Sequence, residues 1–426
     1  MNAQNRLLLQ PVFLLGLPFC PVSGYDEEKA RRSAMRKRSV FAAGVLILLC
    51  LLAGCGQKPQ PAPAPEAGAF TLTFITVGKG DAFLLEAPEG RFYLVDTGKD
   101  QDYPQIVRAL RLKGVDRLEG ILLSHGHKDH AGCLEPLLEA FPVGAVYLSG
   151  RDNISYTEID PGAILSGFPD TEQVALTGGE TIELGGAQAQ VWIPDAVDAN
   201  NANNNSMVLR VTHGSCSFLL MGDAELEEEA ALMASGFPLE ADVLKLGHHG
   251  ETDATSPAFL DRVQPDYALI AGNMEENPDS VNKTMAAELD RRNIAFYYSD
   301  GDCLDFISDG SSISVEPLQD RGLPRTEELS FAEVDRKNQA VSIRNDGEKT
   351  ADLEGCVLIS TRGDEIFHFP SGTVLDPGQT LTVVCRDSEL AGDLIWEQDS
   401  VWKKKRDDAL LYDRNMNLLD ADHAKQ

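Results

Sequence analysis

The sequence is poor in positive charge, in closely spaced cysteine pairs and in long apolar runs, and each shortage excludes a class of protein. Its 37 lysines and arginines face 67 acidic residues, a formal net charge of −30, so the surface offers no diffuse attraction to nucleic acid. None of the eight cysteines forms a CxxC pair, and the odd number after Cys55 argues against a disulfide framework. A single Cys356–Cys385 bridge stays open as an alternative. The apolar run Ser39–Leu52 has 14 residues, short of the ~20 that cross a bilayer.

The N-terminal region has the order of a targeting signal. Three basic residues precede the apolar run, and Leu52-Ala53-Gly54-Cys55 closes it, which is typical of a secretory signal and resembles a bacterial lipobox. The resemblance implies a lipoprotein signal peptide at 35–54, lipid attachment to Cys55, and a location at the extracellular face of the cell membrane. Met35 begins this signal, so residues 1–34 are hypothesised to be a misassigned upstream extension. Residues 55–69, rich in proline and alanine, are predicted to be an extended tether.

A chain of 426 residues is expected to hold two or three domains. From residue 70 to 315, apolar runs with strand character alternate with amphipathic helical segments, which favours an α/β domain with two sheets between helices. Residues 150–179 show little periodicity and are predicted to be a loop. Residues 316–327 read as a linker, and beyond them a period of two predicts a small all-β module.

The strongest chemical signal is the segment Ser124–His130. Three of the eight histidines and one aspartate lie within six positions, directly after the apolar run Ile121–Leu123. Imidazole suits zinc and similar divalent ions, and a carboxylate adds an oxygen ligand. The segment is therefore predicted to be a metal site at the end of a buried strand.

Other polar residues also follow apolar runs. Asp96, Asp223 and the pair His248-His249 each stand where a predicted buried strand opens into a loop. A carboxylate in a protein core is costly without a partner, so these groups are expected to share one site with the histidine segment.

In sequence order, these motifs resemble the metallo-β-lactamase superfamily and, within it, the ComEC-like hydrolase branch. The resemblance rests on Phe74–Asp81, Val95–Gly98, His125–His130, Asn203–Ser206, Gly222-Asp223 and Lys245–Gly250. It implies an αββα sandwich over residues 70–315.

The resemblance also implies roles for single residues. It assigns His125 and His127 to a first metal ion, Asp129 and His130 to a second, and Asp223 to a position between them. Spacing leaves open whether His248 or His249 ligates; we favour His248 as the ligand, with Asp129 and His249 as the catalytic groups. The predicted substrate contacts or ligand-orienting groups are Asp81, Asp96, Asn205 and Ser206.

The third motif departs from the superfamily pattern. Where the superfamily usually supplies another histidine, this chain has Asn204-Asn205-Ser206. True β-lactam hydrolases keep that histidine, so the chain is predicted not to be one. The change implies weaker ligation of the first metal or a substrate contact. His213 lies at the far end of a predicted strand and is expected at the surface.

Residues 328–423 resemble a lamin-tail domain, an immunoglobulin-like β-sandwich. The resemblance rests on Val341–Gly347, Leu353–Leu358, Phe367–Pro370, Val374–Leu381 and Ala409–Asp413. It implies an accessory or anchoring role. The basic run Lys403–Arg406 has two interpretations, a solvated loop or a contact with a polyanion or the cell wall.

The sequence thus predicts a metal-dependent extracellular hydrolase, a phosphodiesterase or nuclease that uses a hydroxide activated by two divalent ions. Zinc is the expected metal, with manganese as the alternative. The substrate would be a phosphodiester in nucleic acid or a cell-wall polymer, the membrane would be reached through a lipid anchor, and no protein partner is evident. Two alternatives remain, an esterase acting on cell-wall phosphodiesters or phosphocholine, and a surface binding protein with a vestigial metal site.

Overall fold

The computed structural model describes residues 68–151, 158–272, 283–362, 365–403 and 405–424. The predicted signal peptide, the lipid-bearing Cys55 and almost all of the tether lie outside these ranges. Among the described residues, no helix is both long and apolar enough to cross a membrane.

The first sheet carries the histidine motif. Within the described ranges it has eight strands, parallel from β3 to β6 and antiparallel elsewhere. Their spatial order is β15 (Ile313–Pro317), β14 (Leu304–Ser308), β1 (Phe70–Phe74), β2 (Phe83–Glu86), β3 (Phe92–Val95), β4 (Leu118–Leu122), β5 (Val143–Ser149) and β6 (Glu172–Leu176).

The second sheet carries the other predicted ligands. It has seven strands in the described part of the chain, with β10 to β13 parallel. Their order is β13 (Ala295–Tyr298), β12 (Tyr267–Ile270), β11 (Val243–Lys245), β10 (Cys216–Leu220), β9 (Val208–His213), β8 (Gln188–Trp192) and β7 (Thr181–Glu183).

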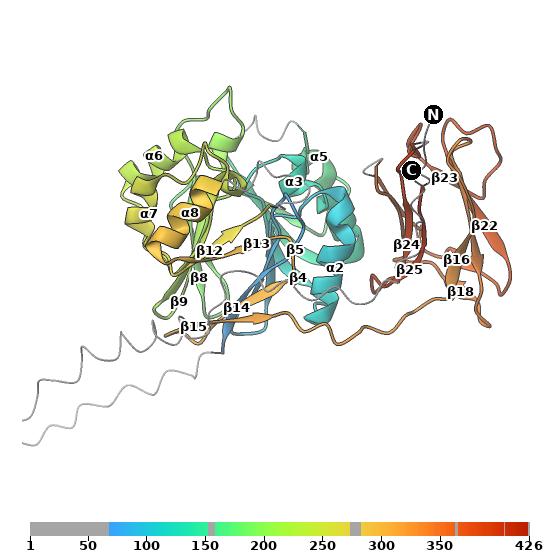
Figure 1. The fold of residues 1–426 in the computed structure, drawn as a ribbon, viewed down its shortest axis with the longest axis horizontal. Coiled ribbons are helices and arrows are strands. Elements are labelled where there is room, and N and C mark those ends of the chain that lie inside the picture. Colours follow the sequence, from blue (N-terminus) through green and yellow to red (C-terminus); the bar gives the residue numbers. More distant parts are fainter. Residues whose placement is uncertain (1–67, 152–157, 273–282, 363–364, 404, 425–426) are drawn as a thin grey trace, which may run out of the picture. The chain divides into compact units, whose positions relative to one another are not determined.

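The two sheets lie face to face with helices on their outer faces (Figure 1), and apolar side chains fill the layers between them. Phe70, Phe83 and Phe218 belong to the core between the sheets. Outside the first sheet lie α2 (Tyr103–Leu112), α3 (Lys128–Ala131), α4 (Leu134–Ala140) and α5 (Pro161–Leu165). Outside the second lie α6 (Leu226–Ser235), α7 (Pro257–Val263) and α8 (Lys283–Arg292). The predicted αββα sandwich is confirmed.

The C-terminal region is all-β, as predicted. One sheet contains β16 (Leu329–Asp335), β17 (Ala340–Asn345), β22 (Thr380–Cys385) and β23 (Leu394–Trp396). Another contains β20 (Glu365–His368), β19 (Val357–Ser360), β24 (Ala409–Tyr412) and β25 (Leu418–Asp422), and β18 (Ala351–Asp352) pairs with β21 (Val374–Leu375). Trp396 and Trp402 pack edge to face in the core of this region, with their ring centroids 5.7 Å apart.

Three expectations need correction or completion. The predicted loop at 150–179 contains α5 and β6, and Asp160 caps α5 by accepting from the Ala163 amide at 3.0 Å. His213 is 2% exposed, not at the surface, because it packs against Phe70 and its Nδ1 lies 3.0 Å from the Ser308 hydroxyl. Cys356 and Cys385 are both free.

Candidate metal centre

The site forms where strands of both sheets end. β3 and β4 run parallel in the first sheet, as do β10 and β11 in the second, so each pair delivers its carboxyl ends to one edge. Asp96 follows β3, the segment His125–His130 follows β4, Asp223 follows β10, and the 3₁₀ turn η4 (Gly247–Gly250) follows β11. Backbone hydrogen bonds join the loops, including Asp81 N to Asp129 O at 3.0 Å.

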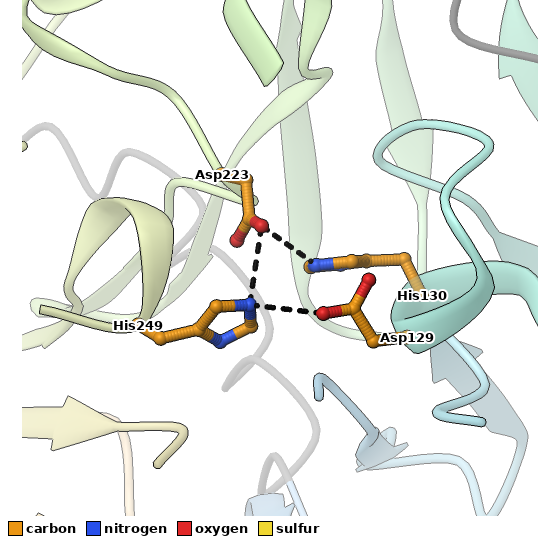
Figure 2. A group of neighbouring side chains, drawn as sticks. All are labelled: Asp129, His130, Asp223 and His249. Atoms are coloured by element: carbon orange, nitrogen blue, oxygen red, sulfur yellow. Dashed lines mark ion pairs between the residues drawn. The ribbon is translucent and has the colours of Figure 1, made fainter. Parts of the chain in front are cut away.

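Four side chains converge on one point in this region (Figure 2). The Nε2 atoms of His130 and His249 each lie 3.1 Å from the same Oδ2 atom of Asp223. Asp129 Oδ2 lies 3.4 Å from His249 Nε2. One potential ligand atom from each residue falls within 4.8 Å of all the others. We call Asp129, His130, Asp223 and His249 the quartet.

The quartet contains buried nitrogen atoms without hydrogen bonds. Among the described residues, neither Nε2 of His130 nor Nε2 of His249 has a hydrogen-bond partner, although both rings are fully buried. Buried polar atoms rarely stay unpaired, and leaving one unpaired costs free energy. Two imidazole nitrogens that face two carboxylates make a donor set suited to a divalent cation. The residues therefore fit a metal ion.

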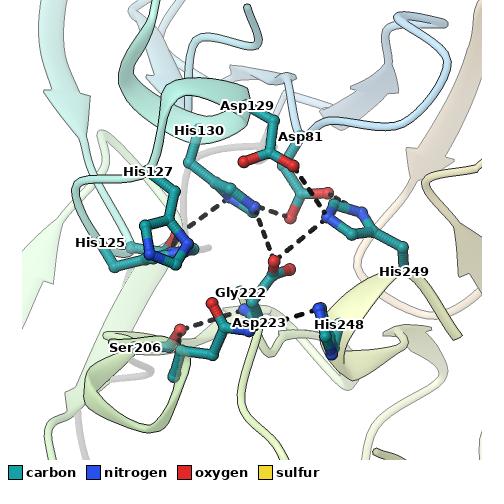
Figure 3. Close-up of polar contacts among 12 residues, drawn as sticks. Asp81, His125, His127, Asp129, His130, Ser206, Gly222, Asp223, His248 and His249 are labelled. Atoms are coloured by element: carbon teal, nitrogen blue, oxygen red, sulfur yellow. Dashed lines mark hydrogen bonds and ion pairs between the residues drawn. The ribbon is translucent and has the colours of Figure 1, made fainter. Parts of the chain in front are cut away.

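Carboxylates also lie near the far nitrogens of the two imidazole rings, and Figure 3 shows one of them, Asp81, beside His130 and His249. Asp96 lies 2.9 Å from His130 Nδ1 and accepts hydrogen bonds from the Ser124 amide and hydroxyl, both at 2.7 Å. Asp81 Oδ1 lies 3.8 Å from His249 Nδ1. A carboxylate that is hydrogen-bonded to the far nitrogen, as Asp96 is to His130, orients a ligating histidine and fixes its tautomer.

A buried lysine lies beside these carboxylates. Lys245, at the end of β11, is fully buried and places its ammonium 2.6 Å from both Asp81 Oδ2 and the Gly222 carbonyl oxygen. It also lies 3.4 Å from Asp223 Oδ1. Burial disfavours its charged form, but Asp81 and Asp223 raise the pKa of Lys245, so it stays protonated.

Burial and charge also oppose each other at the acids. Burial alone would raise the pKa of Asp223, but the imidazoles of His130 and His249 hold it well below its usual range. At Asp129, burial would likewise raise the pKa, but the nearby imidazoles of His249 and His130 lower it. Both carboxylates are therefore ionised at neutral pH, as metal ligands must be.

His125 and His127 lie beside the quartet. His125 is fully buried, and its Nε2 lies 3.0 Å from His127 Nδ1. Burial lowers the pKa of His125 well below its usual value, so its ring is neutral and able to ligate. The structure thus brings five of the six predicted ligands to one region.

The sixth predicted ligand, His248, lies elsewhere. Its Nδ1 is 2.9 Å from Asp253 and 3.6 Å from Glu225, and its Nε2 is 3.3 Å from Asn203 Nδ2. Its neighbour His249 occupies the quartet instead. Both residues have positive φ angles, 40° and 55°, and this sparsely populated backbone sends the two rings to different partners. In the structure, His249 therefore lies where His248 was expected among the ligands, and His248 lies outside the quartet.

The third-motif side chains bind protein atoms. Asn205 Oδ1 accepts from the Asp198 amide at 2.7 Å, and its Nδ2 donates to the Asp198 carbonyl at 3.0 Å. The Ser206 hydroxyl donates to the Asn203 carbonyl and accepts from the Asp223 amide at 3.0 Å. Next to this hydroxyl, Gly222 has a φ of 53°, and a Cβ there would fall 2.8 Å from Ser124 Cβ. Both Ser206 and Gly222 therefore hold Asp223 in place.

An ion pair lies at the rim. Lys79 and Glu251 are 2.7 Å apart, with side chains 24% and 26% exposed. Each stands two residues in the sequence from a residue of this region, Lys79 from Asp81 and Glu251 from His249. Sequence reasoning assigned no ion pair to Lys79 and missed Lys245, although a lysine within the apolar run Val243–Leu246 was a usable signal.

Residues 75–272 match the metallo-β-lactamase superfamily, and residues 324–424 match the lamin tail domain. The chain contains a metallo-β-lactamase domain. This metallo-β-lactamase domain holds the quartet, His125 and His127, and a lamin tail domain follows it, as predicted.

Competence proteins are among its homologues. ComE operon protein 3 of Bacillus subtilis is 28% identical over 251 residues, which cover 53% of this chain and 31% of that protein. Competence protein ComA of Neisseria gonorrhoeae is 30% identical over 234 residues, covering 52% and 29%. The chain therefore spans less than a third of these relatives. Among solved structures, the metallo-β-lactamase fold protein YhfI of Bacillus subtilis is 14% identical, with a TM-score of 0.40, over 57% of this chain and 100% of that one.

Proposed function

We propose that the metallo-β-lactamase domain is a metal-dependent phosphodiesterase that acts on a polymer such as DNA. The observation that carries the proposal is the buried quartet, in which two imidazole nitrogens without hydrogen bonds face two ionised carboxylates. The mixed nitrogen and oxygen donors suit zinc, with manganese as the alternative. Bound divalent ions would lower the pKa of water and neutralise charge on a phosphoryl group.

The surrounding residues support hydrolysis without a serine nucleophile. The hydroxyl of Ser124 lies near His125 but donates to Asp96 and is buried. Asp96 holds the ring of His130 at 2.9 Å, and Asp81 lies 3.8 Å from the ring of His249. The site is thus built to keep ligands fixed, which argues against a vestigial site.

The rim favours an anionic substrate. On a chain with a net charge of −30, Lys79 offers a local positive charge beside the quartet, held by Glu251. A phosphate oxygen can replace the Glu251 carboxylate as its partner. His248, 16% exposed on its side chain and held by Asp253, is the second candidate for a substrate contact. The competence-related homologues make nucleic acid the first substrate to test.

We also propose that the chain is a lipoprotein, attached through Cys55 to the extracellular face of the membrane. The order of basic, apolar and small residues before Cys55 supports this. Metabolic labelling with palmitate should mark the wild-type chain and not Cys55→Ala. A labelled Cys55→Ala variant would contradict the anchor.

The substrate is tested by offering the purified chain single-stranded DNA, RNA and wall teichoic acid, with Asp223→Asn as the matched inactive variant. We expect DNA cleavage that the variant lowers by about 100-fold or more, because even residues behind metal ligands change activity by 10–100-fold. Cleavage of teichoic acid alone would favour the cell-wall esterase. Polymer binding without any cleavage would favour a binding protein.

A further inference from the structure

We infer that the two metal positions implied by the fold are unequal, so that this chain binds one ion tightly at the quartet and a second ion weakly at His125 and His127. The inference rests on the proposed function and specifies the order in which the site fills. The inference concerns the chain's own metal-binding atoms. The quartet and the pair His125 and His127 differ in the number of these atoms and in the side chains that hold them.

The quartet supplies a complete donor set. Two imidazoles and two carboxylates come from three separate loops, and their ligand atoms lie within 4.8 Å of one another. Asp96 holds His130 at 2.9 Å, and Asp81 lies 3.8 Å behind His249. Because four donors are already gathered, an ion entering here requires little rearrangement.

In the described part of the chain, the second metal position has only two potential ligands of its own, His125 and His127. His125 Nε2 and His127 Nδ1 are 3.0 Å apart. Among the described residues, neither histidine joins a group of three metal-binding side chains that meet within the same distance. Asn205 and Ser206, in the third motif, cannot add a donor without breaking other contacts. Asn205 makes two hydrogen bonds with the Asp198 backbone, and Ser206 binds Asn203 and Asp223.

Asp223 also favours the quartet. Its Oδ2 atom faces both His130 and His249 at 3.1 Å, while its Oδ1 atom lies 3.4 Å from the buried ammonium of Lys245. A second cation that used Oδ1 would compete with this fixed positive charge. Lys245 therefore weakens Asp223 as a bridging ligand.

The charge balance leads to the same conclusion. The four carboxylates of Asp81, Asp96, Asp129 and Asp223 outnumber the one ammonium of Lys245, so a first divalent ion leaves one formal negative charge. A second divalent ion would leave excess positive charge in a buried site, which is costly unless an anion enters with it. A phosphate group supplies that anion, so phosphate is expected to strengthen the second site.

The test is a titration of the metal-stripped full-length chain with Mn²⁺, in which free and bound ions are distinguished by electron paramagnetic resonance. We expect one tight ion per chain and a second that binds at least about 100-fold more weakly. Added inorganic phosphate should tighten the second site selectively. The result needs no substrate turnover.

Variants separate the two sites. Asp129→Asn, at a partly exposed position, should remove the tight ion, and His127→Ala should leave it in place while removing the weak one. His423→Ala, at an exposed histidine of the lamin tail domain, is the matched control and should change neither. Circular dichroism of each variant shows whether it is folded.

The outcomes distinguish this inference from the proposed function. Two ions of equal affinity, or loss of the tight ion in His127→Ala, would overturn the inequality and leave the phosphodiesterase proposal intact. A folded wild-type chain that binds no Mn²⁺ or Zn²⁺ would overturn both.

Discussion

The ammonium of Lys245 and the carboxylate of Asp81 lie 2.6 Å apart, with the two side chains 0% and 1% exposed. Removing one partner of a buried ion pair leaves an uncompensated charge, so Lys245→Met should destabilise the chain by about 3–5 kcal/mol. Denaturant unfolding of the metal-stripped protein measures this. Arg386→Met, at an exposed pair with Glu397, is the control and should have little effect. A Lys245→Met variant as stable as wild type would show that the pair does not stabilise the fold.

The two adjacent histidines should behave differently when replaced. His249→Ala removes a quartet donor and should lower the bound metal after dialysis to a small fraction of the wild-type amount. His248→Ala should keep its metal because that ring faces Asp253 and Glu225. Elemental analysis of both variants, purified in parallel, gives the comparison. Retention of metal by His249→Ala and its loss from His248→Ala would restore the assignment expected from the sequence.

Lys79 should affect substrate binding more than turnover. Lys79→Ala removes the rim cation and is expected to raise KM for a phosphodiester by about 10-fold, equivalent to about 1.4 kcal/mol, with little change in kcat. Glu251→Gln frees the ammonium from its 2.7 Å partner and should lower KM. Steady-state kinetics at two salt concentrations tests both variants. An unchanged KM in Lys79→Ala would remove this residue from the substrate site.

Cysteine chemistry gives a pH-dependent prediction. Burial raises the pKa of Cys356 to about 12 and that of Cys133 well above its usual value, so both thiols stay protonated near the ordinary thiol pKa of about 8.5. In the folded chain, only the partly exposed Cys303 is expected to react readily with a thiol reagent among the five described cysteines. Denaturation should expose the others. Rapid labelling of Cys356 before unfolding would contradict the buried thiol.

The fold could be predicted from the sequence because the pattern of apolar residues in each strand agrees with how deeply that strand is buried. Phe70–Val77 alternates apolar residues with threonine and Cys216–Met221 is mostly apolar, and the strands that they form, β1 and β10, are fully buried. The motifs fall where such strands end. The segment 150–179 was predicted less well. Its helix α5 is five residues long and its strand β6 is largely exposed, so neither leaves a clear hydrophobic period.

The residue types of the site could be predicted from the sequence, but the contacts of individual side chains could not. The residue types and spacing of His125–His130 indicated a metal, and Asp223 and the histidine pair followed from strand ends. The choice between His248 and His249 depends on two consecutive left-handed backbone conformations, which no spacing rule encodes. The depth at which Lys245 lies depends on its distant partner Asp81, more than 160 residues earlier. Such long-range pairing is set only when the sheets pack together.

The most direct measurement of the central claim is hydrolysis of bis(p-nitrophenyl) phosphate by the full-length chain before chelation, after chelation, and after Zn²⁺ or Mn²⁺ is restored. The quartet predicts activity that disappears with the metal, returns with it, and is absent from Asp223→Asn under all three conditions. Hydrolysis that persists in the metal-stripped protein, or a folded and metal-loaded wild-type chain that cleaves no phosphodiester, would contradict the account.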